Sequence, residues 1–398
     1  MSHQLRCRRC ETIAEPAPTD ACHRCDGPTD VVYDWERLTD ALSSSVIGER
    51  PPNLWRYQEL LPTGARVDVG SGWTRLVPCE PLSELLELDL WLKLESENPT
   101  RSYKDRTATL AVSAALDHGV TTICCSSTGN LGDAVAAAAA ATGVEAVVLV
   151  PEGSASAAVE AEHRDVHVLA VRGSYDDCRR LELELSALFP WGFVSGNLHP
   201  YASEGAKTIA FEIAEQLRWH LPDAVVCPAA SGTLFAKLTQ GFAELTRAGL
   251  APEPLPRMFA AQALGSSPIA AAFADDRSIS RVQPDTHVAS LAVGDPSYGD
   301  LALGAARATG GAVLALPENE ISAYTELLTE TTGVAPDASG GAALGALVAA
   351  RRSGMIEEGS QVVLVVTGRR PRARVEGPHV RTVDPGAADV LAALGLDS

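Results

Sequence analysis

Lysine is scarce in this chain, and one lysine stands where a nucleophilic amine would be useful. The 398 residues include 32 lysines and arginines, and the only lysines are Lys93, Lys104, Lys207 and Lys237. Lys104 lies in the segment NPTRSYKDR (98–106), between an apolar run that ends in KLE and a helical pattern. A lysine at the start of a helix, shielded from water beside a phosphate-binding loop, can form a Schiff base with a carbonyl cofactor.

Three further loops contain the small residues that let a backbone approach an anion. The hydroxyls and glycines of SSTGNLG (126–132) suit a carboxylate, AASGT (229–233) suits a phosphate, and the role of GDPSYG (294–299) is less clear. Each loop is expected to join a strand to a helix, where free N–H groups and the helix dipole attract negative charge. Each loop alone is also compatible with an ordinary structural turn, because α/β proteins need small residues there.

Four of the nine cysteines form two closely spaced pairs near the N-terminus. Eleven residues separate Cys7-x-x-Cys10 from Cys22-x-x-Cys25, and four thiolates at this spacing can surround Zn²⁺ tetrahedrally. A redox pair would normally lie between a strand and a helix, and disulfides are rare in a reducing compartment. We therefore predict a structural zinc ribbon. The remaining cysteines have apolar neighbours and are predicted to be core thiols: Cys79, Cys124, Cys125, Cys178 and Cys227.

Strands that alternate with helices must position these loops. From about residue 90, short β-rich runs alternate with helical patterns such as 203–217 and 318–331, which indicates parallel sheets covered on both faces. There are too many units for one small sheet, so we predict an α/β fold with two doubly wound parallel-sheet domains. The predicted strands are 88–95, 121–126, 145–151, 165–171, 224–229, 257–263, 312–317 and 361–368.

Composition and charge exclude several classes of function. Acidic residues outnumber basic residues by 51 to 32, and the net charge of −19 repels nucleic acids and anionic lipid surfaces. No apolar run reaches the roughly 20 residues that a membrane-spanning helix needs, and the N-terminus does not look like a signal peptide. We therefore expect a cytoplasmic protein with neither a nucleic-acid nor a membrane partner.

Taken together, the motifs resemble those of threonine synthases, which are pyridoxal-phosphate (PLP) enzymes of fold type II. KLESENPTRSYKDR (93–106) is similar to the motif K-x-E-x-x-NPTGSFKDR, and STGN (127–130) is similar to the asparagine loop. SEGAKTIAFE (203–212) resembles the EGxKTxAxE helix, and VVTG (365–368) resembles the strand that ends at the pyridine nitrogen. The resemblance spans roughly residues 65–370 and implies a homodimer that acts on a small amino-acid substrate. The cysteine pairs also resemble those of many archaeal and some bacterial threonine synthases.

The resemblance implies a role for each matching residue. Lys104 would carry PLP as a Schiff base and move protons, Asn130 would contact the 3′ oxygen, and Thr367 would meet the pyridine nitrogen. A hydroxyl does not keep that nitrogen protonated as an aspartate would, which favours elimination and replacement over transamination. The cofactor phosphate would bind to Ala229, Ala230, Ser231, Gly232 and Thr233, and the substrate carboxylate to Ser127, Thr128 and Gly129.

We expect the chain to divide into four parts. Residues 1–33 form the zinc-ribbon-like segment, and residues 34–90 contain a polar helix and linker (34–60) and part of the large domain. Residues 91–202 are assigned to a small α/β domain. Residues 203–385 are assigned to a large PLP-binding α/β domain.

Two departures from the family pattern concern the substrate. Arg101 replaces the glycine of the motif. HPYAS (199–203) stands where bacterial threonine synthases usually have a basic residue for the substrate phosphate, and no lysine or arginine lies between Arg180 and Lys207. A guanidinium at position 101 can bind an anionic substrate group in bidentate fashion. The alternative is that Arg101 simply points into solvent.

The predicted reaction is that of a carbon–oxygen lyase that converts O-phosphohomoserine and water to threonine and phosphate. Within the same fold, the alternative is β-replacement or elimination on an activated serine, as in cysteate synthase, cysteine synthase or serine/threonine dehydratase. A zinc-ribbon nucleic-acid binder would not explain the acidic chain or the lysine motif. A dinucleotide-binding enzyme would need G-x-G-x-x-G after its first strand, and that pattern is absent. The substrate, the nucleophile and any allosteric effector stay open.

Overall fold

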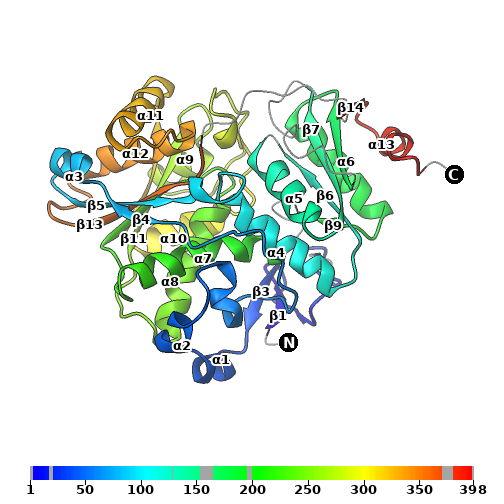
Figure 1. Cartoon of the computed structure of the whole chain (residues 1–398). Coiled ribbons are helices and arrows are strands. Elements are labelled where there is room, and N and C mark those ends of the chain that lie inside the picture. Colours follow the sequence, from blue (N-terminus) through cyan, green and yellow to red (C-terminus); the bar gives the residue numbers. More distant parts are fainter. Residues whose placement is uncertain are drawn as a thin grey trace.

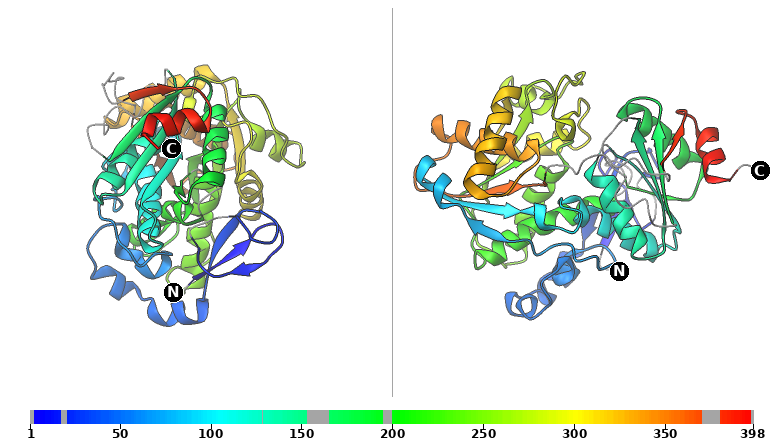
Figure 2. Two further views of the ribbon diagram at one scale, coloured as in Figure 1. Left: turned by 90° about the vertical axis from the view of Figure 1, so that its right-hand side faces the viewer. Right: turned by 45° about the horizontal axis from the view of Figure 1, so that its top comes forward.

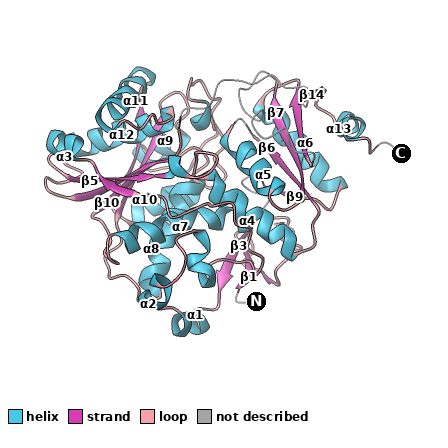
Figure 3. Cartoon of the chain, in the orientation of Figure 1, coloured by secondary structure: helices cyan, strands magenta, loops and turns pink. Residues whose placement is uncertain are grey.

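Two separate β-sheets organise the structure, and helices cover both faces of each (Figures 1 and 3). The computed structural model describes residues 3–17, 21–127, 129–152, 165–194, 200–369 and 380–396. All eight predicted strands are present, with ends that differ by at most two residues from those expected. The alternation of strands and helices in the sequence therefore predicted the architecture correctly.

The larger sheet has six strands in the order β12-β11-β10-β13-β5-β4, and every neighbouring pair is parallel except β4 and β5. Its strands are β4 (Leu76–Pro78), β5 (Asp89–Leu94), β10 (Ala224–Pro228), β11 (Arg257–Ala263), β12 (Ala312–Leu316) and β13 (Gln361–Val366). The central strands are apolar throughout their length, as strands buried between two helical layers must be.

Two groups of helices bury the larger sheet. One face packs against α7 (Pro200–Gln216), α8 (Thr233–Arg247), α9 (Pro268–Ala274) and α10 (Gly299–Ala308). The other face packs against α3 (Glu80–Leu86), α11 (Glu318–Thr332) and α12 (Ala338–Arg352). Two short 3₁₀ helices, η2 (Glu95–Glu97) and η3 (Ala289–Leu291), lie in the connections.

The smaller sheet is entirely parallel, with the strand order β14-β8-β7-β6-β9. Its strands are β6 (Thr122–Ser126), β7 (Glu145–Pro151), β8 (Val166–Val171), β9 (Gly192–Phe193) and β14 (Val380–Val383). One face packs against α4 (Lys104–Asp117) and α5 (Asn130–Ala140), and the other against α6 (Tyr175–Leu188) and α13 (Ala387–Leu394). Among the described helices, none has the length and apolar character needed to cross a membrane.

The division of the chain between the two sheets is less simple than the predicted split at residues 91–202 and 203–385. β5 precedes the strands of the smaller sheet but lies inside the larger one, between β13 and β4. β14 comes after the last strand of the larger sheet and yet pairs with β8 at the edge of the smaller one. β5 and β13 therefore lie in the larger domain, whereas α4 and β14, which follow them along the chain, pack in the smaller domain (Figure 1).

Residues 34–60, expected to be a polar helix and linker, contain three short helical elements. They form α1 (Trp35–Ala41), α2 (Ser44–Gly48) and the 3₁₀ helix η1 (Leu54–Leu60). Tyr57 is fully buried against Phe211 of α7, with ring centres 5.2 Å apart. The charge of Arg56 is tolerated inside because its guanidinium forms hydrogen bonds of 2.7 and 3.0 Å with Glu215.

The N-terminal segment is a three-stranded antiparallel sheet with the order β2-β1-β3. Its strands are β1 (His3–Cys7), β2 (Ile13–Ala14) and β3 (Thr29–Tyr33). Leu5, Val31 and Tyr33 share a hydrophobic cluster with residues of α7 and α8, so this segment packs against the larger domain (Figure 2).

Three of the four lysines lie in buried ion pairs, and their side chains are at most 3% exposed. The pairs are Lys93–Glu212 (2.7 Å), Lys207–Glu204 (2.5 Å) and Lys237–Glu204 (2.5 Å). Arg106 also binds Glu212. Although burial opposes the ionised form, the Arg106 and Lys93 charges hold the pKa of Glu212 at about 2.

Candidate active site

The loops singled out in the sequence meet at the carboxyl edge of the larger sheet. β10, β13 and β5 are parallel neighbours, so their carboxyl ends lie side by side. β5 leads through residues 95–103 to Lys104, β13 ends just before Thr367, and β10 leads through residues 229–232 to α8. Open α/β sheets bind their ligands at this edge.

Lys104 begins α4 and differs from the three lysines of the interior. Its Nζ atom lies 4.8 Å from the centre of the Tyr103 ring, and none of the described carboxylates forms an ion pair with it. Burial opposes the charge on this amine, but its interaction with Tyr103 outweighs that effect and raises the pKa of Lys104 above 10.5. The free amine is therefore protonated at neutral pH, and it becomes a nucleophile when that proton is removed.

Thr367 is backed by buried polar groups that the sequence motifs did not indicate. Its Oγ1 atom lies 3.0 Å from Ser339 Oγ, which donates a 2.6 Å hydrogen bond to Asp337. While Asp337 is ionised, Ser339 uses its proton there, so Thr367 must donate to Ser339. Burial raises the pKa of Asp337, and a protonated carboxyl would allow the hydrogen-bond chain to reverse.

Asn130 belongs to the smaller domain and lies at the same carboxyl edge of the larger sheet. It is the first residue of α5, which follows β6. A Cβ atom on Gly368 would lie 3.3 Å from Asn130 Nδ2, 3.3 Å from Asp337 Oδ2 and 3.4 Å from Arg101 O. Polar atoms of both domains therefore surround Gly368, and Asn130 lies directly beside the end of β13.

The loop 229–233 has the geometry of an anion site. Gly232 has φ +84°, and a Cβ atom there would lie only 2.7 Å from Tyr298 O, so glycine is required. The Tyr298 N–H donates to Ser231 O at 2.8 Å. None of the described side chains caps the N-terminus of α8. Its free N–H groups and the helix dipole therefore favour a phosphate at this point.

The loop 127–130 is tied down by a serine. Ser127 Oγ accepts hydrogen bonds from the N–H groups of Gly129 (3.0 Å) and Gly132 (2.9 Å), so its side chain shapes the turn into α5. Thr128, the second predicted carboxylate contact, lies outside the described residues. Binding of a substrate carboxylate by Ser127, Thr128 and Gly129 stays a prediction.

Arg101 and Arg369 are neighbours at the sheet edge. The Arg369 N–H donates to Arg101 O at 3.0 Å, and Ser102 pairs with Gly368. Arg101 has φ +71°, which costs a side-chain-bearing residue about 1 kcal/mol. Arg369 Nε is buried without a hydrogen-bond partner among the described residues. Arg369 was missed in the sequence, although it directly follows the motif VVTG (365–368).

Comparison with known proteins decides the family. The model of the protein family described as "Pyridoxal-phosphate dependent enzyme" matches residues 67–368. The chain belongs to this family. Threonine synthase of Methanocaldococcus jannaschii is 31% identical over 371 residues, which cover 91% of each chain. Threonine synthase of Mycobacterium bovis is 32% identical over 349 residues, which cover 85% of this chain and 95% of the relative. The resemblance to threonine synthases is thereby confirmed.

Solved structures of other proteins share the fold. The processed form of threonine deaminase isoform 2 from Solanum lycopersicum gives a TM-score of 0.64 at 19% identity, covering 75% of this chain and 80% of that chain. Maize serine racemase gives a TM-score of 0.64 at 20% identity, and the match covers 76% of this chain and 88% of that chain. The predicted fold-type II architecture is confirmed.

The residues at the sheet edge fit PLP as a cofactor. Lys104 offers an amine for the carbonyl group, and the loop before α8 offers uncapped N–H groups for the phosphate. Thr367 offers a hydroxyl at the end of β13, and Asn130 offers an amide from the opposite domain. Each kind of group that the family's cofactor needs is therefore present where the strands converge.

The four N-terminal cysteines come together as predicted. Their sulfur atoms all lie within 4.8 Å of one another, with Cys7–Cys25 at 3.5 Å and Cys10–Cys22 at 3.6 Å. Sulfur atoms bound to one tetrahedral zinc ion are separated by roughly 3.8 Å, so this set fits Zn²⁺. The contact with the Cys10 sulfur raises the pKa of Cys25 to about 12. The five remaining cysteines are buried, as expected for core thiols.

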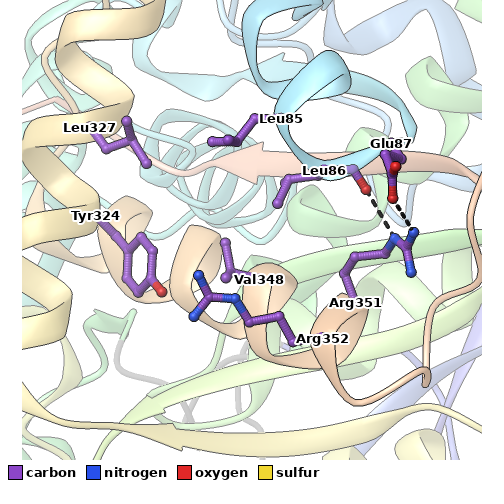
Figure 4. A pocket seen from close by; sticks show the side chains of 8 residues that line it. All are labelled: Leu85, Leu86, Glu87, Tyr324, Leu327, Val348, Arg351 and Arg352. Carbon is purple, nitrogen blue, oxygen red and sulfur yellow. Dashed lines mark hydrogen bonds and ion pairs between the residues drawn. The ribbon is translucent and has the colours of Figure 1, made fainter.

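A surface pocket elsewhere on the larger domain is not part of this site. It lies between α3, α11 and α12, where Tyr324 and Arg351 contribute to its wall (Figure 4). Arg351 is held there by an ion pair with Glu87 at 2.8 Å. None of the residues that line it belongs to the converging loops.

Proposed function

We propose that this protein is a PLP-dependent lyase of the threonine synthase type, which converts O-phosphohomoserine and water to threonine and phosphate. The observation that carries the proposal is the convergence of Lys104, Thr367 and the loop 229–233 on three adjacent strand ends, with Asn130 of the smaller domain beside them. The relatives that are 31 to 32% identical over most of the chain support the same activity.

The residues of the site divide the work of this reaction. Bound PLP would act as an electron sink that labilises bonds at the α and β carbons of an amino acid. Lys104 would hold the cofactor through its amine, and the same amine would move protons between substrate carbon atoms. Asn130 and Thr367 would hold the ring from different domains, so ring binding would depend on both. The loop 229–233 would hold the cofactor phosphate through backbone N–H groups.

Arg101 and Arg369 supply the positive charge that the segment HPYAS (199–203) lacks. Their backbones are hydrogen-bonded to each other, and Arg101 precedes Lys104 by three residues. Arg369 Nε is buried without a partner among the described residues, and a guanidinium nitrogen in that position gains from an anionic ligand. We assign the phosphate of O-phosphohomoserine to this pair.

The second candidate is β-replacement or elimination on an activated serine. It is favoured by the same absence of a basic residue between Arg180 and Lys207 in the sequence. Because these substrates are shorter by one methylene group, the distance from the reacting carbon to the anion site distinguishes them. Homodimer formation is a prediction for either candidate.

Substrate tests separate the candidates. The purified protein is incubated separately with O-phosphohomoserine and O-phosphoserine, and phosphate release and amino-acid products are measured. Threonine from O-phosphohomoserine supports the first proposal. Turnover of O-phosphoserine alone supports the second, and turnover of neither contradicts both.

Borohydride reduction followed by peptide mapping tests the cofactor attachment. The scarcity of lysine makes the result unambiguous, because Lys93, Lys207 and Lys237 are buried in ion pairs. A single modified lysine at position 104 is expected. Modification at any other lysine would contradict the assignment.

A further inference from the structure

The first cysteine pair encloses two arginines with different environments. Arg8 and Arg9 both stand between Cys7 and Cys10. Arg9 is exposed, and its Nη1 atom donates to Cys25 O at 3.0 Å. Arg8 turns toward the larger domain, where its guanidinium lies 3.9 Å from the centre of the Tyr298 ring.

Arg8 is fixed in this position from two sides. Its Nε and Nη2 atoms each donate a 2.8 Å hydrogen bond to Asp30 of β3. Its own N–H donates to Pro28 O at 2.9 Å. A cation over an aromatic face contributes more when both are shielded from water, and the Tyr298 side chain is only 2% exposed.

Tyr298 connects Arg8 to the loop 229–233. Its backbone N–H donates to Ser231 O at 2.8 Å, and its carbonyl oxygen lies 2.7 Å from where a Cβ atom on Gly232 would be. Its hydroxyl donates to Ser203 Oγ at 3.2 Å, at the start of α7. The loop GDPSYG, whose role was unclear in the sequence, therefore supports the loop before α8.

The rest of the N-terminal sheet is anchored to the same helices. Tyr33 donates a 3.0 Å hydrogen bond to Glu204 and accepts one of 3.1 Å from Lys207. Lys237 lies 3.9 Å from Asp30, the partner of Arg8. Figure 2 shows the N-terminal sheet, in blue, directly beside the green helices of the larger domain.

We propose that Arg8 is a positioning residue for the cofactor phosphate. The four-cysteine cluster holds Arg8 against Tyr298, and Tyr298 holds the loop 229–233 in the form that receives the phosphate. This inference rests on the proposed role of that loop. It makes the zinc ribbon part of the cofactor site, although none of the ribbon's described residues lies at the sheet edge.

The two arginines of the cysteine pair provide a matched comparison. The dissociation constant of PLP is measured by absorbance titration of cofactor-free wild type, Arg8→Met and Arg9→Met. Arg8→Met is expected to weaken PLP binding about tenfold, whereas Arg9→Met should bind as wild type does. Pyridoxal, which lacks the phosphate, should bind all three equally. Unchanged PLP binding by Arg8→Met, or an equal loss for pyridoxal, overturns the proposal.

Arg8→Lys keeps a cation but not the paired hydrogen bonds to Asp30, so it should recover part of the affinity. It also provides a test if Arg8→Met does not fold. The thermal midpoint and zinc content are recorded for each variant. Wild-type affinity in Arg8→Met with full zinc content would contradict the role of Arg8 directly.

Metal removal and a loop variant complete the test. Wild type treated with a chelator should lose PLP affinity as Arg8→Met does, and chelation should add little to the loss in Arg8→Met, since both act on one contact. Full affinity without zinc, or fully additive losses, overturns the proposal.

Ser231→Asp places a negative charge in the loop 229–233 itself. If Ser231→Asp binds PLP normally, the proposed phosphate loop is wrong; if it alone weakens binding, only the role of Arg8 is wrong.

Discussion

Replacing Arg101 with glycine should relieve backbone strain in the folded protein and weaken substrate binding at the same time. The residue has φ +71°, a conformation that glycine adopts without penalty. Relief of the backbone strain is worth about 1 kcal/mol. The greater freedom of glycine in the unfolded chain takes back roughly half of that. We therefore expect Arg101→Gly to be more stable than Arg101→Ala by about 0.5 kcal/mol, because only the alanine variant keeps the strain.

The loss of the guanidinium should weaken substrate binding equally in Arg101→Gly and Arg101→Ala. A charge-assisted hydrogen bond contributes about 1.5–3 kcal/mol, so we expect KM for O-phosphohomoserine to rise at least tenfold. Arg101→Lys should fall between these variants and wild type, because lysine keeps the charge but loses the bidentate geometry. The visible absorbance of the bound cofactor should not change, since its phosphate is assigned to the loop 229–233.

The stability of each variant is measured by denaturant titration. The KM values for O-phosphohomoserine and O-phosphoserine are measured by steady-state kinetics. Unaltered KM for both substrates in all three variants would refute the idea that a strained arginine is kept for anion binding. A stability gain without a kinetic change would leave Arg101 as an unfavourable residue with no role in the reaction. Arg369 would then be the next residue to replace.

Other consequences of the structure can be measured directly. Lys104→Ala should abolish both turnover and the visible absorbance while the far-UV circular dichroism stays unchanged; a retained visible band would contradict its role. Because the pKa of Lys104 is raised, capture of PLP by cofactor-free protein should accelerate by up to about tenfold per pH unit between pH 7 and 9; a flat rate profile would show that its deprotonation does not limit capture. The pKa of Glu204 and Glu212 is lowered from 4.5 to about 2, so the stability they provide is complete above about pH 4.5 and is lost as the pH falls toward 2. Glu212→Gln should therefore lower the free energy of unfolding by about 3–5 kcal/mol at pH 7 and flatten this acid dependence. Asp34 forms an exposed ion pair with Arg37, so Asp34→Asn should change the free energy of unfolding by less than about 1 kcal/mol. Metal analysis should return about one zinc per chain, and Cys7→Ser should release it; a metal-free native protein would exclude the zinc ribbon.

The sequence predicted those parts of the site that depend on local pattern. The strands were found because their apolar runs are continuous, and Lys104 and Thr367 were found because their motifs are linear. Contacts between distant segments had no such signal. Tyr298 supports Ser231 from 67 positions further along the chain, and Ser339 and Asp337 reach Thr367 from the start of α12. Arg56 looked like a surface residue because its partner Glu215 lies on another helix.

The use of lysine in this chain follows from what arginine cannot do. An arginine remains protonated at any accessible pH, so it could not act as the amine nucleophile that we propose at position 104. At positions 207 and 237 the requirement is size, since Glu204 accepts from both Lys207 and Lys237 at 2.5 Å. Two planar guanidinium groups would need more room than two ammonium groups around one carboxylate. Arg106, which faces two carboxylates at once, uses the wider geometry of its guanidinium for that purpose. The few lysines therefore mark the positions where a compact or a titratable amine is needed, and only Lys104 among them lies at the sheet edge.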